Sequence, residues 1–155
     1  MRDDDFVRLI ESMTQTLYRV CCTQLRNPSD REDAVQEALR RAWEKRHSLR
    51  NDDYAQTWVI RILLNECDRI RRKQAKCRPQ PVEAATHPQE TAGTIKQAVQ
   101  SLPDGLRETV LLHYLEGYSV EAVARMLRIP TGTAKSRLHR GRRELRRILD
   151  EEIEE

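Results

Sequence analysis

The sequence predicts an all-α protein built as two small helical domains joined by a flexible linker. Apolar residues recur at helical spacing through most of the chain, and no convincing alternation typical of β-strands appears. Residues 77–93 lack this periodicity and contain three prolines and a glycine, a composition typical of linkers. The 155 residues, of which 34% are charged and 5% aromatic, suit two domains with modest aliphatic cores. We therefore expect domains at residues 1–76 and 94–150.

Two helices separated by an Asn-Pro break are predicted at the start of the chain. Apolar residues keep helical spacing over residues 3–26, and Asn27 and Pro28 interrupt the pattern. Ser29 is followed by Glu32 three residues later, a capping-box pattern that predicts Ser29 as the cap of the second helix. The two apolar stripes are Phe6, Leu9, Ile10, Met13, Leu17 and Val20, then Val35, Ala38, Leu39, Ala42 and Trp43.

A polar loop and a third long helix complete the first predicted domain. Residues 48–54 are polar, and helical periodicity resumes from about residue 55 to about residue 73. This helix runs into a basic segment, residues 69–78, in which six of ten residues are Lys or Arg and none is acidic. Its apolar face comprises Trp58, Val59, Ile62, Leu63, Cys67 and Ile70.

The second predicted domain contains a helix-turn-helix. Pro103 suits the first turn of one helix, and Gly117 suits the position that closes it. Ser119 and Thr131 fit the caps of two further helices, which the short connection at residues 128–130 would join tightly. The small residues Ala124 and Ala134 would let these two helices cross closely, as a helix-turn-helix requires.

The last of these helices has the composition of a DNA recognition helix. Between Lys135 and Arg147 seven residues are Lys or Arg and one, Glu144, is acidic. Polar side chains near the start of such a helix can reach base edges, while flanking Lys and Arg neutralise phosphates. Two separate basic segments in a chain of net charge +3 suggest two contacts with a polyanion. The alternatives are solvated helix faces or a basic amphipathic helix that packs on a protein partner.

Features of the N-terminus and the cysteines point to a cytosolic protein. Met1 is followed by Arg2 and three aspartates, and no apolar stretch approaches the roughly 20 residues that a membrane span needs. The four cysteines have no metal-ligand spacing and no C-x-x-C pattern, so we expect free thiols and no metal site. They are Cys21, Cys22, Cys67 and Cys77.

Several segments resemble extracytoplasmic-function (ECF) sigma factors of the sigma-70 family. The C-terminal half, above all Ile129-Pro-Thr-Gly-Thr-Ala-Lys-Ser-Arg-Leu-His-Arg-Gly-Arg142, resembles sigma region 4. In the N-terminal half, Asp30-Arg-Glu-Asp-Ala-Val-Gln-Glu37 and Thr57-Trp-Val-Ile-Arg-Ile62 resemble parts of region 2. The two motifs occur in the family's order around the linker, and the resemblance covers nearly the whole chain.

The resemblance implies a subunit that binds core RNA polymerase and directs transcription from promoters with −35 and −10 elements. The resemblance also implies an anti-sigma factor as a partner, often membrane-anchored in this family. Carried over by position, the polymerase-binding residues are Asp33, Gln36, Glu37 and Arg40. The −10 element would be bound, with one base flipped into the polar loop, by Asn51, Asp52, Asp53, Tyr54, Arg61, Asn65, Arg69, Arg71, Arg72 and Lys73. The −35 element would be read by Thr133, Lys135, Ser136, Arg137, His139 and Arg140.

Other classes of protein explain the sequence less completely. A helix-turn-helix regulator that is not a polymerase subunit would account for the C-terminal half but not for the region 2-like helices. An enzyme would need a phosphate-binding loop, a metal motif or a nucleophile motif, and none is present. A pure protein-interaction module would leave the basic recognition helix unexplained. We therefore expect no enzymatic activity, no cofactor and no small-molecule substrate.

Overall fold

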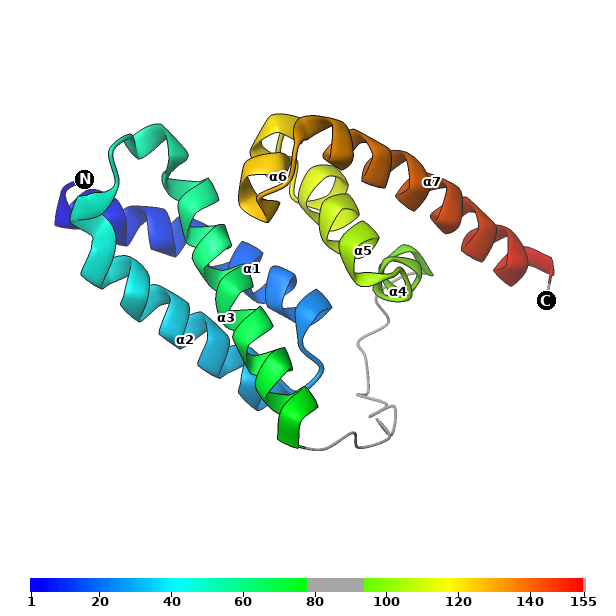
Figure 1. Ribbon diagram of the computed structural model, residues 1–155, viewed down its shortest axis with the longest axis horizontal. Helices are drawn as coiled ribbons and strands as arrows, with labels where there is room; N and C mark the ends of the chain where they lie inside the picture. Colours follow the sequence, from blue (N-terminus) through cyan, green and yellow to red (C-terminus); the bar gives the residue numbers. More distant parts are fainter. Residues whose placement is uncertain (78–93, 155) are drawn as a thin grey trace. The chain divides into compact units, whose positions relative to one another are not determined.

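The computed structural model describes residues 1–77 and 94–154, and every element in these ranges is helical (Figure 1). The all-α prediction is therefore confirmed. The chain divides into two compact units on either side of the segment between Cys77 and Thr94. The linker predicted at residues 77–93 lies outside the described residues, except that Cys77 is the last residue of a helix.

The first unit consists of three long helices and two short 3₁₀ turns. Its elements are α1 (Asp3–Gln24), α2 (Pro28–Lys45), η1 (Arg46–Ser48), η2 (Asp52–Tyr54) and α3 (Ala55–Cys77). Each long helix contacts the other two, so the unit is a three-helix bundle (Figure 1). The polar segment predicted as a loop at residues 48–54 contains the whole of η2, and α3 continues a turn beyond its predicted end.

The predicted cap of α2 is wrong by two residues. Asn27, not Ser29, is the cap, because its side-chain oxygen accepts a hydrogen bond from the Ser29 N–H at 2.9 Å. Pro28 occupies the first helical position, where its missing N–H costs nothing and its fixed φ favours the helix. The Asn-Pro pair that was expected only to break α1 therefore also starts α2.

The core of the first unit is aliphatic. The predicted stripe of α1 supplies Phe6, Met13, Leu17 and Val20, all buried. The face that α2 buries is made of small side chains, which permit a close approach of α3. These residues are Ala34, Val35, Ala38 and Ala42.

Trp43 is not the core residue that its helical spacing predicted. It is 40% exposed and lies at the edge of the bundle, with its ring centroid 5.6 Å from that of Phe6. The Arg46 guanidinium lies over the indole at 3.7 Å, and its Nε donates to Asp3 at 2.8 Å. The Trp43–Phe6 ring contact and the Arg46–Asp3 hydrogen bond therefore join the start of α1 to the end of α2, and the cation–π contact holds Arg46 on the indole.

The second unit contains the shorter helices and the predicted helix-turn-helix. Its elements are α4 (Thr94–Gln100), α5 (Asp104–Val110), the π-helical turn η3 (Leu111–Leu115), α6 (Val120–Leu127) and α7 (Thr131–Glu154). Val99, Leu102 and Val110 form a buried cluster, onto which Leu145 and Ile148 of α7 pack. Gly117 has φ +78°, a left-handed conformation that glycine adopts without strain and that ends η3 as predicted.

Two of the predicted helix starts in this unit shift by one residue. Ser119 caps α6 as expected, because its Oγ accepts the Ala122 N–H at 3.1 Å. Thr131, by contrast, is the first helical residue of α7, and Pro130 holds the cap position with its carbonyl accepting the Ala134 N–H. Pro103 likewise precedes α5 instead of lying in its first turn.

Gly141 marks a close crossing of α5 and α7 that allows no side chain. A Cβ at Gly141 would lie 2.5 Å from Cγ2 of the buried Val110. We expect Gly141→Ala to lower the free energy of unfolding by about 1–3 kcal/mol, because overpacking outweighs the roughly 1 kcal/mol that alanine gains in a helix. Urea denaturation measures the change. Gly132→Ala is the matched control, since nothing lies within 4 Å of its Cβ, and it should stabilise the protein.

A buried thiol pair joins α1 to α3. The Sγ atoms of Cys21 and Cys67 lie 3.8 Å apart, and both residues are fully buried, whereas Cys22 is exposed. The neighbouring Cys21 thiol and burial both raise the pKa of Cys67, so the reactive thiolate is disfavoured. We expect a thiol reagent to label Cys22 in the folded protein, and Cys21 and Cys67 only after unfolding. Mass spectrometry assigns the label by residue, and rapid native labelling of Cys67 would contradict this packing.

Candidate nucleic-acid interface

The first turns of α7 present a polar and basic face to solvent. Lys135, Ser136, His139 and Arg140 are exposed, and their spacing of three and four residues places them on one side of the helix. The opposite side, Ala134 and Leu138 with Gly141, is buried. The helix is therefore anchored by its apolar side and leaves its polar side accessible.

Two predicted members of this face differ from the other four. Thr133 is half-buried at its flank. Arg137 is also half-buried, and its guanidinium carbon lies 3.5 Å from the position that a Cβ on Gly105 of α5 would occupy. Arg137 thus packs over the start of α5, and the structure separates it from the exposed set.

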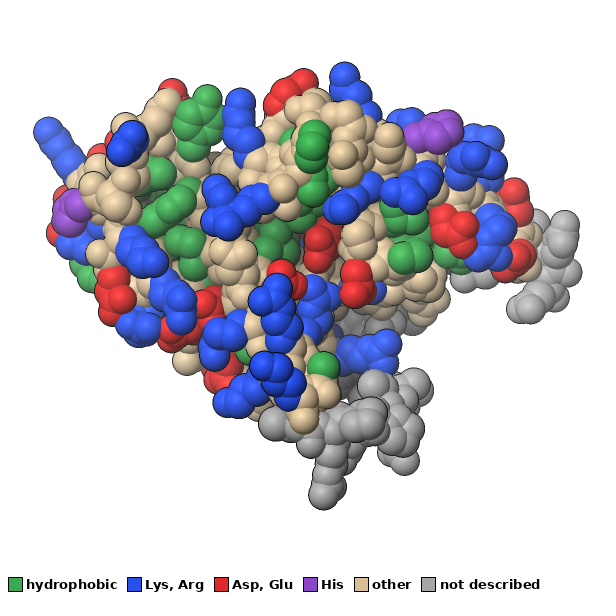
Figure 2. All heavy atoms as spheres, viewed as in Figure 1, with side chains coloured by type: hydrophobic (Ala, Val, Ile, Leu, Met, Phe, Trp, Pro, Cys, Tyr) green, Lys and Arg blue, Asp and Glu red, His purple; other side chains and the backbone are tan. Residues whose placement is uncertain are grey.

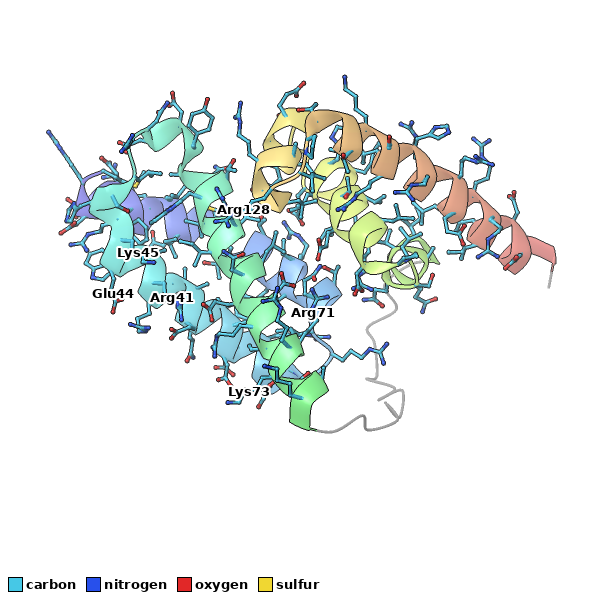
Figure 3. The ribbon with its side chains drawn as sticks, viewed as in Figure 1. Arg41, Glu44, Lys45, Arg71, Lys73 and Arg128 are labelled. Carbon is cyan, nitrogen blue, oxygen red and sulfur yellow. The ribbon has the colours of Figure 1, made fainter. Side chains whose placement is uncertain are left out.

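A tight turn fixes α7 relative to α6. Arg128 adopts a left-handed conformation with φ 55°, and the Ile129 N–H donates to the Ala124 carbonyl at 3.0 Å (Figure 3). These two features form a C-terminal capping motif that ends α6 within one residue. Ala124 and Ala134 are buried where α6 and α7 contact each other, as the small-residue pattern predicted.

Two of the basic residues farther along α7, Arg142 and Arg147, are engaged within the protein. Arg142 donates to the Tyr114 hydroxyl at 2.5 Å. Arg147 pairs with Glu144 and Glu151, and hydrogen bonding with Glu144 raises the pKa of Arg147 and lowers that of Glu144. Arg143 and Arg146 are also exposed, so cationic surface continues along α7 beyond the first three turns.

A second basic face runs along α3. Asn65, Arg69, Arg72, Lys73 and Lys76 line one open hollow, and their spacing places them on one side of the helix. Lys and Arg side chains gather over the last turns of α3 in Figure 2. Most of the predicted −10 residues of this helix are thus brought together.

Arg71 and the short turn before α3 show more constrained geometry. Arg71 is partly buried and pairs with Asp68 one turn earlier (Figure 3). The Asn51 side-chain oxygen accepts the Asp53 N–H at 3.0 Å, so it caps η2. Asp52, Asp53 and Tyr54 are exposed in η2, and Arg61 is half-buried on α3.

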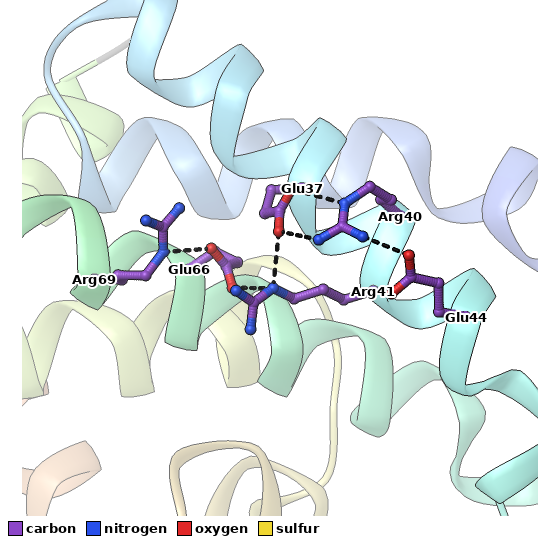
Figure 4. A network of polar contacts seen from close by, with 6 residues as sticks. All are labelled: Glu37, Arg40, Arg41, Glu44, Glu66 and Arg69. Carbon is purple, nitrogen blue, oxygen red and sulfur yellow. Dashed lines mark hydrogen bonds and ion pairs between the residues drawn. The ribbon is translucent and has the colours of Figure 1, made fainter.

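The outward face of α2 carries interlinked charges. Arg40 forms two hydrogen bonds to the Glu37 carboxylate, at 2.6 and 3.0 Å, and also pairs with Glu44 (Figure 4). Arg41 also donates to the Glu37 carboxylate, at 3.0 Å. The hydrogen bonds from Arg40, and after them the one from Arg41, lower the pKa of Glu37 to about 2. Asp33 and Gln36 are exposed on the same helix. The four residues predicted to bind polymerase therefore share one accessible helix.

Glu66 is a polar residue that the sequence did not single out. Its side chain is only 3% exposed, and its two oxygens each form a 2.9 Å ion pair, one with Arg41 of α2 and one with Arg69 of α3 (Figure 4). A sequence signal existed, because Glu66 interrupts the apolar stripe between Leu63 and Ile70. A charged residue inside a buried stripe requires a partner.

The ranges that the structure describes offer neither a metal site nor a membrane-spanning helix. No group of His, Cys, Asp and Glu there has the arrangement of a metal site. Among the same residues, no helix combines the length and the apolar character required to cross a bilayer. The helix-turn-helix and the two basic faces define the class of the chain as a DNA-binding protein with an additional helical bundle.

Comparisons with known proteins identify the family within this class. Residues 9–76 match sigma-70 region 2, and residues 92–145 match sigma-70 region 4. The ECF RNA polymerase sigma factor SigM of Mycobacterium tuberculosis is 36% identical over 152 residues, covering 93% of this chain and 76% of SigM. SigW of Bacillus subtilis, also an ECF RNA polymerase sigma factor, is 31% identical over 167 residues, covering 94% of this chain and 89% of SigW.

Solved structures agree with the sequence relatives. The sigma factor RpoE of Bartonella quintana, in complex with the anti-sigma factor NepR, superposes with a TM-score of 0.79 at 25% identity, covering 94% of this chain and 97% of RpoE. CnrH, in complex with the cytosolic domain of CnrY, has the same fold, with a TM-score of 0.69 at 20% identity, covering 96% of this chain and 90% of CnrH.

The chain belongs to the ECF family of RNA polymerase sigma factors. It directs promoter-specific initiation of transcription, and the alternative of a regulator that is not a polymerase subunit is not favoured. Sigma factors are not enzymes.

Proposed function

We propose that the two units divide promoter recognition, with α7 reading the −35 element and α3 with η2 binding the −10 element. The observation that carries this proposal is the exposed face of α7, where four polar or basic side chains stand on a helix held by a tight turn to α6. A helix presented in this way enters the major groove with its first turns facing the bases.

In the major groove the exposed residues have distinct chemical capacities. Arg140 and Lys135 can donate to guanine acceptors or to phosphates, and Ser136 and His139 can donate or accept hydrogen bonds. Arg137, packed over Gly105, is better suited to a phosphate contact at the flank than to a base contact.

The hollow on α3 suits a phosphate backbone. Arg72, Lys73 and Lys76 supply three cations along one helix side, and Asn65 and Arg69 supply an amide and a guanidinium that can pair with a base. η2, with the exposed Tyr54 and two exposed aspartates, immediately precedes this helix. We assign it to the base that leaves the duplex, because an exposed aromatic ring offers a stacking surface.

The polymerase contact is assigned to α2. Asp33, Gln36, Glu37 and Arg40 form a mixed acidic and basic face that neither proposed DNA contact uses. The proposed domains are residues 1–76 for polymerase and the −10 element, and 94–150 for the −35 element. An anti-sigma factor is a further proposed partner, since the related RpoE was solved with one, and a membrane-anchored one would hold this chain at the membrane.

Localised DNA cleavage from the holoenzyme tests the division of roles. An iron chelate that generates hydroxyl radicals is attached through a cysteine placed at Lys135 or at Gln56, in a background in which Cys22 and Cys77 are serine. We expect cleavage around −35 from position 135 and around −10 from position 56. Cleavage by both probes in the same element, or the reverse assignment, would refute the division.

A further inference from the structure

Glu66 holds the side chain that α3 presents to DNA. Its Oε2 accepts from Nε of Arg69 at 2.9 Å across one helical turn. The Glu66 carboxylate is 3% exposed, whereas the Arg69 side chain is 53% exposed. A fixed, buried anion therefore restrains Nε of a guanidinium whose other two nitrogens point away from the carboxylate (Figure 4).

The same carboxylate is tied to α2. Its other oxygen, Oε1, forms an ion pair with Nε of Arg41 at 2.9 Å, and this nitrogen donates to Glu37 at 3.0 Å. Glu66 is thereby held from both sides and cannot rotate without losing a buried ion pair. Figure 4 shows the resulting chain of contacts from Arg69 through Glu66 and Arg41 to Glu37 and Arg40.

We propose that Glu66 is a positioning residue for promoter recognition, which orients Arg69 toward one base pair of the −10 element. The inference rests on the assignment of Arg69 to that element under the proposed function. A free arginine next to a backbone binds any phosphate, whereas a guanidinium fixed at one nitrogen discriminates between bases. Glu66 therefore contributes to sequence discrimination, although it contacts no DNA and lowers the local positive charge.

Removal of the Glu66 carboxylate should change DNA affinity and base preference in opposite directions, which makes the proposal testable. Removal of the Glu66 charge adds net positive charge to α3 and should strengthen binding to any DNA. It should also free Arg69 and reduce the preference for the right base. If Glu66 had a purely structural role, its substitution would lower the fraction of active protein but not the promoter preference. The ratio of initiation at two promoters does not depend on the fraction of active protein.

The experiment is initiation by the holoenzyme on a consensus promoter and on single −10 substitutions. Arg69→Ala first identifies the position at which the consensus-to-substituted ratio falls. We expect Glu66→Gln to lower the ratio at that same position by about fivefold, the lower end of what one side chain's base contact contributes. In the Arg69→Ala background, Glu66→Gln should produce no further change in the ratio.

Two control variants separate positioning from charge and from the α2–α3 link. Asp68→Asn removes one negative charge from the same helix but leaves the Arg69 ion pair, so it should preserve the ratio. Arg41→Met breaks the link to α2 but leaves Glu66 on Arg69, so it should lower the ratio less than Glu66→Gln does. If Glu66→Gln does not fold, Glu66→Asp keeps the charge, withdraws the carboxylate from Arg69 and should lower the ratio too.

The possible failures are distinguishable. If Arg69→Ala lowers the ratio but neither Glu66 variant does, the positioning role is wrong and the −10 assignment survives. An equal loss in Arg41→Met and Glu66→Gln would assign Glu66 to the α2–α3 link alone and overturn the inference. If Arg69→Ala lowers the ratio at no position, the assignment of Arg69 under the proposed function fails first.

Discussion

Arg140→Ala is expected to reduce initiation from promoters that depend on the −35 element by about 5- to 100-fold, while polymerase binding remains intact. Arg140 is exposed in the third turn of α7, on the same side as Lys135, Ser136 and His139. Loss of a base-contacting arginine costs about 1–3 kcal/mol and relaxes the preference at the contacted position. Run-off transcription on promoters with single −35 substitutions measures both effects.

The matched control lies on the same helix. Arg147→Ala removes the same charge about two turns later, where the guanidinium is already paired with Glu144 and Glu151. It should leave −35 discrimination unchanged. A parallel loss of polymerase affinity in Arg140→Ala, measured by competition with the native chain, would contradict the −35 role.

Asp33→Lys is expected to weaken binding to core polymerase by at least about tenfold, because like charges placed across an interface cost several kcal/mol. Asp33 is exposed on the α2 face, so the substitution alters the surface and not the core. Binding is measured by titration of a fluorescently labelled chain with core polymerase.

Glu11→Lys is the control for this reversal of charge. Glu11 is exposed on α1, in the same bundle, and the change in net charge is identical. It should leave the affinity for polymerase close to that of the native chain. If the two variants weaken binding equally, the effect is one of net charge and α2 is not the docking face.

The sequence predicted the helices well where a single physical signal dominates. The apolar stripe of α1, the Ser119 cap and the glycine at 117 all follow from local preferences, and the structure confirms them. Predictions failed where two signals compete within a few residues. Ser29 and Glu32 match the capping-box pattern, but the preceding Asn-Pro pair combines a capping side chain with a preset φ. The helix therefore starts at Pro28 with Asn27 as its cap.

Residues whose role depends on a partner far along the chain were the hardest to predict. Trp43 matched the helical period of the core, yet it lies at the end of the bundle and stacks with Arg46. The need for glycine at position 141 could not be predicted from the recognition-helix motif, because it arises from the close approach of Val110 on another helix. The burial of Glu66 similarly depends on its ion pair with Arg41, which lies 25 positions earlier in the sequence.

The same distinction between local and tertiary contacts applies to the predicted site residues. Six residues of α7 were predicted to read DNA, and four of them, Lys135, Ser136, His139 and Arg140, share one exposed face. Helical spacing could not show that Arg137 packs on α5, because that contact is tertiary. The DNA and polymerase roles of these residues remain predictions that the substitutions above test.

Reconstituted transcription tests the central claim most directly. Core RNA polymerase is mixed with the purified chain and genomic DNA, and the 5′ ends of the transcripts are sequenced. We predict initiation at a limited set of sites that share two sequence elements, centred near −35 and −10, at a narrow range of spacings. Transcript starts no more specific than those of core polymerase alone, or starts that share only one element, would contradict the account.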